Sequence, residues 1–102
     1  FYHLCNITRS TWEQFMFRML ERAFAVAQRG IAFNVVTQYC DFYEPDLYYC
    51  DIPRLLGFIT HKLSRFFVID HAYPLYELTV SVYHEQGIRD AFPQPEYAKY
   101  FK

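Results

Sequence analysis

Acidic and aromatic side chains gather between Gln38 and Asp51 of this 102-residue chain. The tyrosine rings could pack against an apolar ligand, and the carboxylates could bind a hydroxyl or an amine. The residues concerned are Tyr39, Asp41, Tyr48, Tyr49 and Asp51. In the alternative interpretation Asp51 caps the following helix and the tyrosines pack over the helices. A connection of this length in a compact domain is more often functional than not. The stretch is therefore predicted to be a substrate-contacting loop.

The segment before this loop predicts a buried strand. Residues 31–36 follow Gly30 directly, are nearly all apolar, and are β-branched at three of six positions. Such a run is typical of a parallel strand that is covered on both faces. Its one polar residue, Asn34, is expected to satisfy a buried backbone or loop group. Ligands bind beyond the carboxyl ends of strands in open α/β sheets, where the loop from Gln38 begins.

Helical patterns lie on both sides of this strand. Ser10 stands three residues before Glu13, a capping-box pattern, and Gly30 supplies a stop, so residues 11–29 are predicted to be helical. The apolar stripe of this helix comprises Trp12, Phe15, Met16, Met19, Leu20, Ala23, Val26 and Ala27. Phe17 and Phe24 lie off the stripe and either form a second contact face or widen the first.

A second helix is predicted from Asp51, its N-cap, to about Ser64, with Pro53 in the first turn. Its buried stripe comprises Leu55, Leu56, Ile59 and Leu63. Two strands follow, at 66–70 and 76–82, and their short connection predicts an antiparallel hairpin. The tail from Gly87 to Lys102 has no clear pattern beyond a helical turn near 97–101. The fold class is therefore α/β.

Composition argues against several functional classes. The net charge is −1 with no basic cluster, which argues against a nucleic-acid binder. Three widely spaced cysteines fit reduced thiols in a cytoplasmic protein better than a disulfide framework or a zinc site. We expect no metal site, because no pair of His, Cys or acidic residues has the spacing of metal ligands on a shared helix face. His61, His71 and His84 are expected at the surface or in a turn. No apolar run approaches the length of a membrane span. The 22% aromatic content hints at a missing partner surface.

Four ordered segments carry a resemblance to a known family: Arg29-Gly30-Ile31-Ala32-Phe33-Asn34, Asp46-Leu47-Tyr48-Tyr49 leading to Asp51, Leu63-Ser64-Arg65, and Tyr73-Pro74-Leu75-Tyr76-Glu77-Leu78-Thr79-Val80. They are similar to a bacterial group with the pattern "RRGFAFN … DLYYADP … LSR … HDY … YEFT". Together with the element order, residues 10–84 resemble the C-terminal half of the Rossmann-like (class I) S-adenosylmethionine-dependent methyltransferases. Two departures are His71-Ala72-Tyr73 in place of His-Asp-Tyr, and an additional residue before Pro53.

The resemblance implies a sheet whose last strand is antiparallel to the rest. It also places His3 and Asn6 just past the preceding strand, where the reacting methyl group is presented. His3 is then a candidate base for the acceptor, or alternatively an exposed residue near the chain end, and Asn6 is a candidate substrate contact. The glycine-rich turn and the ribose-binding acid that hold the cofactor are missing from this sequence. We therefore expect no cofactor-binding residue in these 102 residues, and no activity from them alone.

The resulting hypothesis is a single partial domain over residues 1–102, with 85–102 as a tail of unassigned structure. It would belong to a methyltransferase that uses S-adenosylmethionine and acts on a small-molecule acceptor. The strand at 31–37 would have an open edge, which either the missing N-terminal half or a second copy would cover. The alternatives are a non-catalytic α/β protein-interaction module and an inactive methyltransferase remnant.

Overall fold

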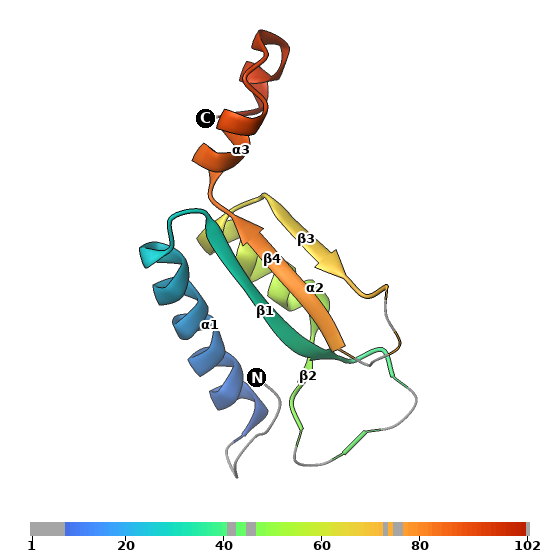
Figure 1. Ribbon diagram of the computed structural model, residues 1–102. Helices are drawn as coiled ribbons and strands as arrows, with labels where there is room; N and C mark the ends of the chain where they lie inside the picture. Colours follow the sequence, from blue (N-terminus) through green and yellow to red (C-terminus); the bar gives the residue numbers. More distant parts are fainter. Residues whose placement is uncertain (1–7, 41–42, 45–46, 73, 75–76, 102) are drawn as a thin grey trace.

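The computed structural model of the protein describes residues 8–40, 43–44, 47–72, 74 and 77–101. They form a four-stranded sheet with helices, shown in Figure 1. The elements in chain order are α1 (Arg9–Val26), β1 (Gly30–Thr37), β2 (Tyr49–Cys50), α2 (Ile52–Phe58), a π-helical turn η1 (Ile59–Leu63), β3 (Phe67–Asp70), β4 (Glu77–Tyr83), α3 (Glu85–Ala91) and a 3-10 helix η2 (Pro95–Tyr100).

The sheet is mixed, with the strand order β2-β1-β4-β3. β1 and β2 are parallel, whereas β4 lies between β1 and β3 and is antiparallel to both. The α/β class and the β3–β4 hairpin are confirmed, and the last strand runs against its neighbours as the resemblance implies. β2 was not predicted, because two residues inside a long loop are too few to show a period.

The core lies on one face of the sheet. β1 contributes Val35, β4 contributes Leu78, Val80 and Val82, and the helices contribute Met16, Leu20, Phe24, Leu55 and Ile59. On the opposite face Ala32 and Asn34 are exposed. The prediction of a strand buried on both faces is therefore wrong for the described residues, because α1 and α2 both pack on the same face. Asn34 does not satisfy a buried group. It accepts a 2.9 Å hydrogen bond from the hydroxyl of Thr79, its cross-strand neighbour.

α1 begins earlier and ends earlier than predicted. Its N-cap is Thr8, whose hydroxyl accepts from the Thr11 amide at 3.2 Å, so the capping box at Ser10 is not used. The helix ends at Val26, and Gly30 opens β1 instead of stopping the helix. At Gly30 the backbone has a φ of +157°, and a Cβ there would lie 2.1 Å from the Val82 carbonyl oxygen. The glycine is needed for the close approach of β4.

The buried face of α1 is rotated from the predicted stripe. Its buried residues are Glu13, Met16, Leu20 and Phe24, whereas Phe15 and Met19 are each 43% exposed and Val26 is 84% exposed. Phe17 stacks on Phe58 with ring centroids 4.3 Å apart. Phe17 and Phe24 thus belong to the contact surface itself, and Phe17 joins α1 to α2.

α2 matches its prediction closely. The Asp51 carboxylate accepts from the Arg54 amide at 3.2 Å as the N-cap, and Pro53 lies in the first turn. Leu55 and Ile59 are fully buried. The π-helical turn then ends the helical segment at Ser64, whose amide donates to the Ile59 carbonyl at 2.9 Å.

Residues 85–101, here named the C-terminal arm, project away from the sheet (Figure 1). It contains α3 and η2, and neither helix has a buried residue. Its end returns to the body, where the Phe101 ring lies 5.8 Å from the Phe66 ring. η2 agrees with the helical turn predicted near 97–101, whereas α3 was not predicted.

Candidate functional site

A hollow of about 320 Å³ lies beside the carboxyl end of β1. It is lined by Arg9, Ser10, Glu13, Tyr48, Tyr49, Asp51 and Arg54. Three segments of the chain meet here: the first turns of α1, the residues entering β2, and the start of α2. The Arg9 guanidinium donates to the Leu47 carbonyl at 2.9 Å, which ties α1 to the chain entering β2. Three of the sequence-predicted residues, Tyr48, Tyr49 and Asp51, thus line the same hollow.

Glu13 forms the wall of this hollow on the side of α1. It is only 8% exposed, and its carboxylate accepts a 3.0 Å hydrogen bond from the Tyr48 hydroxyl and pairs with the Arg54 guanidinium. A buried carboxylate is stable only when such donors replace water. The capping-box interpretation of Glu13 did not predict this role. The available signal was its spacing, because Glu13 precedes Met16 by three residues and Leu20 by seven, which places it on the buried face.

The Tyr48 hydroxyl and the Cys50 thiol stay protonated at neutral pH. Burial, followed by the nearby Cys50 and Glu13, raises the pKa of the Tyr48 hydroxyl well above its usual range. Burial is also the main reason that the pKa of the Cys50 thiol rises to about 12, against the lowering effect of a hydrogen bond with Tyr48. Tyr48 is thus a poor general base, and Cys50 is a poor nucleophile.

The ring of Tyr49 is more accessible than the ring of Tyr48. It is half-buried, its hydroxyl accepts from the Glu44 amide at 2.6 Å, and its ring meets the Tyr43 ring edge-on at 4.7 Å. The Arg9 guanidinium lies 5.8 Å from the centre of the Tyr49 ring. An aromatic ring beside a guanidinium can bind a planar or partly polar ligand by stacking and hydrogen bonding.

The carboxylates of the hollow are already engaged. Glu13 interacts with Tyr48 and Arg54. Asp51 caps α2, which is the alternative role that the sequence suggested for it. The arrangement is therefore suited to binding and orienting a ligand more than to removing a proton from it.

Of the other predicted site residues, Tyr39 is described by the structure and does not line this hollow. Tyr39 is 65% exposed, and its amide donates to the Thr37 hydroxyl at 3.0 Å in the turn that follows β1. His3, Asn6 and Asp41 lie outside the residues that the structure describes, so their roles remain predictions.

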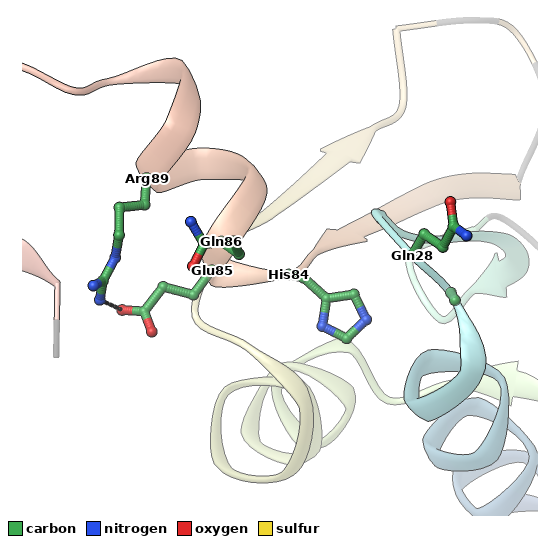
Figure 2. Close-up of a pocket in the computed structure, with 6 residues that line it drawn as sticks. Gln28, His84, Glu85, Gln86 and Arg89 are labelled. Carbon is green, nitrogen blue, oxygen red and sulfur yellow. Dashed lines mark ion pairs between the residues drawn. The ribbon is translucent and has the colours of Figure 1, made fainter.

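A larger hollow, of about 530 Å³, lies at the opposite end of the sheet between α1 and α3. Figure 2 shows that its polar side chains do not converge: Glu85 points to Arg89, with which it forms a 3.6 Å ion pair, while His84 turns the other way. The His84 ring stacks on Phe24 at 3.7 Å, and its Nε2 lies 2.8 Å from the Phe24 carbonyl oxygen. His84 is thus half-buried and not at the surface as predicted, and it anchors the root of the C-terminal arm.

Within residues 8–40, 43–44, 47–72, 74 and 77–101, no three His, Cys, Asp or Glu side chains are grouped so that they could hold a metal ion. No helix in the described part of the chain has the length and apolar character needed to cross a membrane.

Comparison with known proteins found a partial match. The chain is 37% identical over 60 residues to a Mycobacterium tuberculosis protein named "Putative methyltransferase Rv1506c". The matched part is 57% of this chain and 36% of the relative, so the match covers about a third of the length of that curated protein. No family model and no solved structure matches the chain. The sequence is thus related in part to a protein named as a methyltransferase.

Proposed function

We propose that this chain is part of an S-adenosylmethionine-dependent methyltransferase that acts on a small-molecule acceptor. In this proposal the chain supplies the last strands of the sheet and the acceptor side of the site. The partial match to a mycobacterial protein named as a methyltransferase is the observation that carries it. The sheet supports it, because β4 runs antiparallel to β1 and β3 in a mixed α/β sheet.

The hollow beside β1 is the proposed acceptor site. It lies at the carboxyl end of β1, where α/β sheets bind ligands, and it has an aromatic ring and two arginines on its wall. For methyl transfer, the protein mainly has to hold the acceptor in line with the methyl group. Tyr49 and Arg9 would contact the acceptor, while Glu13, Tyr48 and Arg54 would hold that wall in place.

The described residues do not themselves fit the cofactor. A nucleotide-type cofactor needs a glycine-rich turn between a strand and a helix, so that the backbone can approach it. Of the three glycines in the chain, Gly30 opens β1 where β4 approaches, and Gly57 and Gly87 lie inside α2 and α3. We therefore assign cofactor binding to a part of the enzyme beyond this chain.

The edge of β1 on the side of β2 is the proposed junction with that other part. Among the described residues, β2 pairs with β1 only at Val36 and Thr37. A strand that continues the sheet past β1 would pair with backbone groups on this side of β1. We propose that a strand from the rest of the enzyme pairs there.

Titration calorimetry with S-adenosylhomocysteine tests this assignment. We expect the complete protein to bind it, and the 102-residue chain alone to show no heat of binding. If the complete protein does not bind it, the methyltransferase proposal fails and a non-catalytic interaction module or an inactive remnant replaces it. Binding by the chain alone would instead show that the cofactor site was assigned to the wrong part of the protein.

A further inference from the structure

The C-terminal arm has the surface of an interaction element. None of the residues in its two helices is buried, yet it presents three large aromatic side chains: Phe92 is 49% exposed, Tyr97 37% and Tyr100 55%. The rings of Phe92 and Tyr97 meet edge-on with centroids 5.7 Å apart. Grouped exposed aromatics of this kind are characteristic of protein-binding surfaces.

The arm is held in a defined position at both ends. At its root, His84 is bonded to α1 through the Phe24 carbonyl. At its far end, the Arg65 guanidinium donates to the Tyr100 carbonyl oxygen, and the Phe101 ring contacts Phe66. A surface that is already ordered loses less conformational entropy when it binds a partner.

Acidic residues are close in sequence to the aromatic residues of the arm. Asp90 is two residues before Phe92, and Glu96 is next to Tyr97. The arm also holds two cations, of which Arg89 pairs with Glu85 and Lys99 lies 5.2 Å from the centre of the Tyr100 ring. The arm thus has three carboxylates against two cations and is net acidic, although Arg89 lines a hollow together with Phe92.

The outer face of α1 has the complementary character. Phe15 and Met19 are each 43% exposed on it, and they line a hollow of about 90 Å³ together with Arg18 and Arg22. Among the described residues no acidic side chain lines this hollow, although Glu21 is exposed on a neighbouring part of the helix. The surface is thus apolar with basic neighbours.

We propose that the arm of one molecule binds the outer face of α1 in a second copy of the chain. Aromatic side chains of the arm would cover Phe15 and Met19, and the acidic groups of the arm would face the two arginines. The arm does not reach this face of its own molecule, because it leaves the sheet beyond β4 and points away from α1 (Figure 1). Each copy carries both surfaces, so a two-fold dimer would satisfy both at once. This inference is independent of the proposed function.

Light scattering coupled to size exclusion tests the proposal with the 102-residue chain. At about 100 μM, well above the Kd of a micromolar interface, we expect twice the 12.4 kDa chain mass. The double variant Arg18→Glu, Arg22→Glu and the double variant Asp90→Lys, Glu96→Lys should each give the monomer mass. An equimolar mixture of the two should recover the dimer, because each arm then meets a helix of opposite charge. Lys62→Glu, an exposed change on η1, should leave the dimer intact.

A chain that ends at His84 gives a second readout, with far-ultraviolet circular dichroism to verify folding. It should be a monomer, since it lacks the arm but keeps every core residue. A wild-type monomer at this concentration would overturn the proposal. A dimer that survives loss of the arm would assign self-association to another surface, such as the edge of β1, and would also overturn it. If this chain forms a dimer but the complete protein does not, the rest of the polypeptide covers the outer face of α1 in the complete protein.

Discussion

The Tyr48 hydroxyl donates a 3.0 Å hydrogen bond to Glu13 Oε2, and both side chains are buried. Thirty-five residues separate them along the chain. Because Glu13 also pairs with Arg54, one carboxylate joins α1, the start of β2 and α2. The wall of the candidate site is therefore coupled to the packing of the two helices that cover the sheet.

Tyr48→Phe should lower the free energy of unfolding by about 1.5–3 kcal/mol, the usual range for a hydrogen bond to a charged group. The substitution leaves Glu13 buried with one donor fewer. Urea unfolding followed by circular dichroism measures the change. Tyr39→Phe is the matched control, because that side chain is 65% exposed, and it should change stability by less than about 0.5 kcal/mol. Equal effects of the two changes would show that the bond contributes nothing.

Stability should fall in alkaline solution because the Cys50 thiol ionises at lower pH in the unfolded chain than in the folded protein. Burial raises its pKa from 9.0 to about 12 in the folded state, so the unfolded chain loses this proton first. The stabilisation is then complete below about pH 9 and is lost as the pH rises toward 12, by up to about 1.4 kcal/mol per pH unit per proton. Urea unfolding across this pH range measures the slope of stability against pH. The raised pKa of Tyr48 adds to this slope in the same direction.

Cys50→Ala should make that slope shallower, although the cavity also lowers stability at every pH. Val35→Ala is the matched control, since Val35 is equally buried but carries no titrating group. It should lower stability and keep the wild-type slope. An unchanged slope in Cys50→Ala would show that the thiol does not control the alkaline transition.

The parts of the fold that could be predicted are those in which local pattern and tertiary packing agree. Asp51 and Pro53 define the start of α2, and the alternation of Leu78, Val80 and Val82 with polar residues defines the buried face of β4. These signals depend only on neighbours in the chain.

The prediction failed where distant packing decides the outcome. Apolar side chains are distributed so widely around α1 that the predicted stripe included Phe15 and Met19, which the structure leaves exposed. The choice of face depends on where β1 and α2 lie, which periodicity does not reveal. The partnership of Glu13 with Tyr48 and Arg54 could not be predicted for the same reason, because it joins residues 35 and 41 positions apart.

Gly30→Ala should destabilise the protein by about 2–4 kcal/mol. The new Cβ would lie 2.1 Å from the Val82 carbonyl oxygen, so β1 and β4 must separate at that end. Gly57→Ala is the matched control inside α2, where a Cβ has no neighbour within 4 Å. It should stabilise the protein by about 0.5–1 kcal/mol, because alanine is the better helix former. The shift in the urea midpoint measures both, and a destabilising Gly57→Ala would contradict the packing described for α2.

Tyr49→Leu should weaken acceptor binding by the complete protein without affecting its cofactor. Tyr49 supplies the accessible ring beside Arg9 in the proposed acceptor site, and loss of one stacking surface costs about 1–2 kcal/mol, or roughly tenfold in KM for the acceptor. Steady-state rates of methyl transfer measure this KM, and calorimetry with S-adenosylhomocysteine should give the wild-type Kd. Tyr83→Leu, at the other end of the sheet, is the control and should leave both values unchanged. If Tyr49→Leu instead weakens S-adenosylhomocysteine and leaves the acceptor KM unchanged, the hollow beside β1 belongs to the cofactor and the acceptor binds elsewhere.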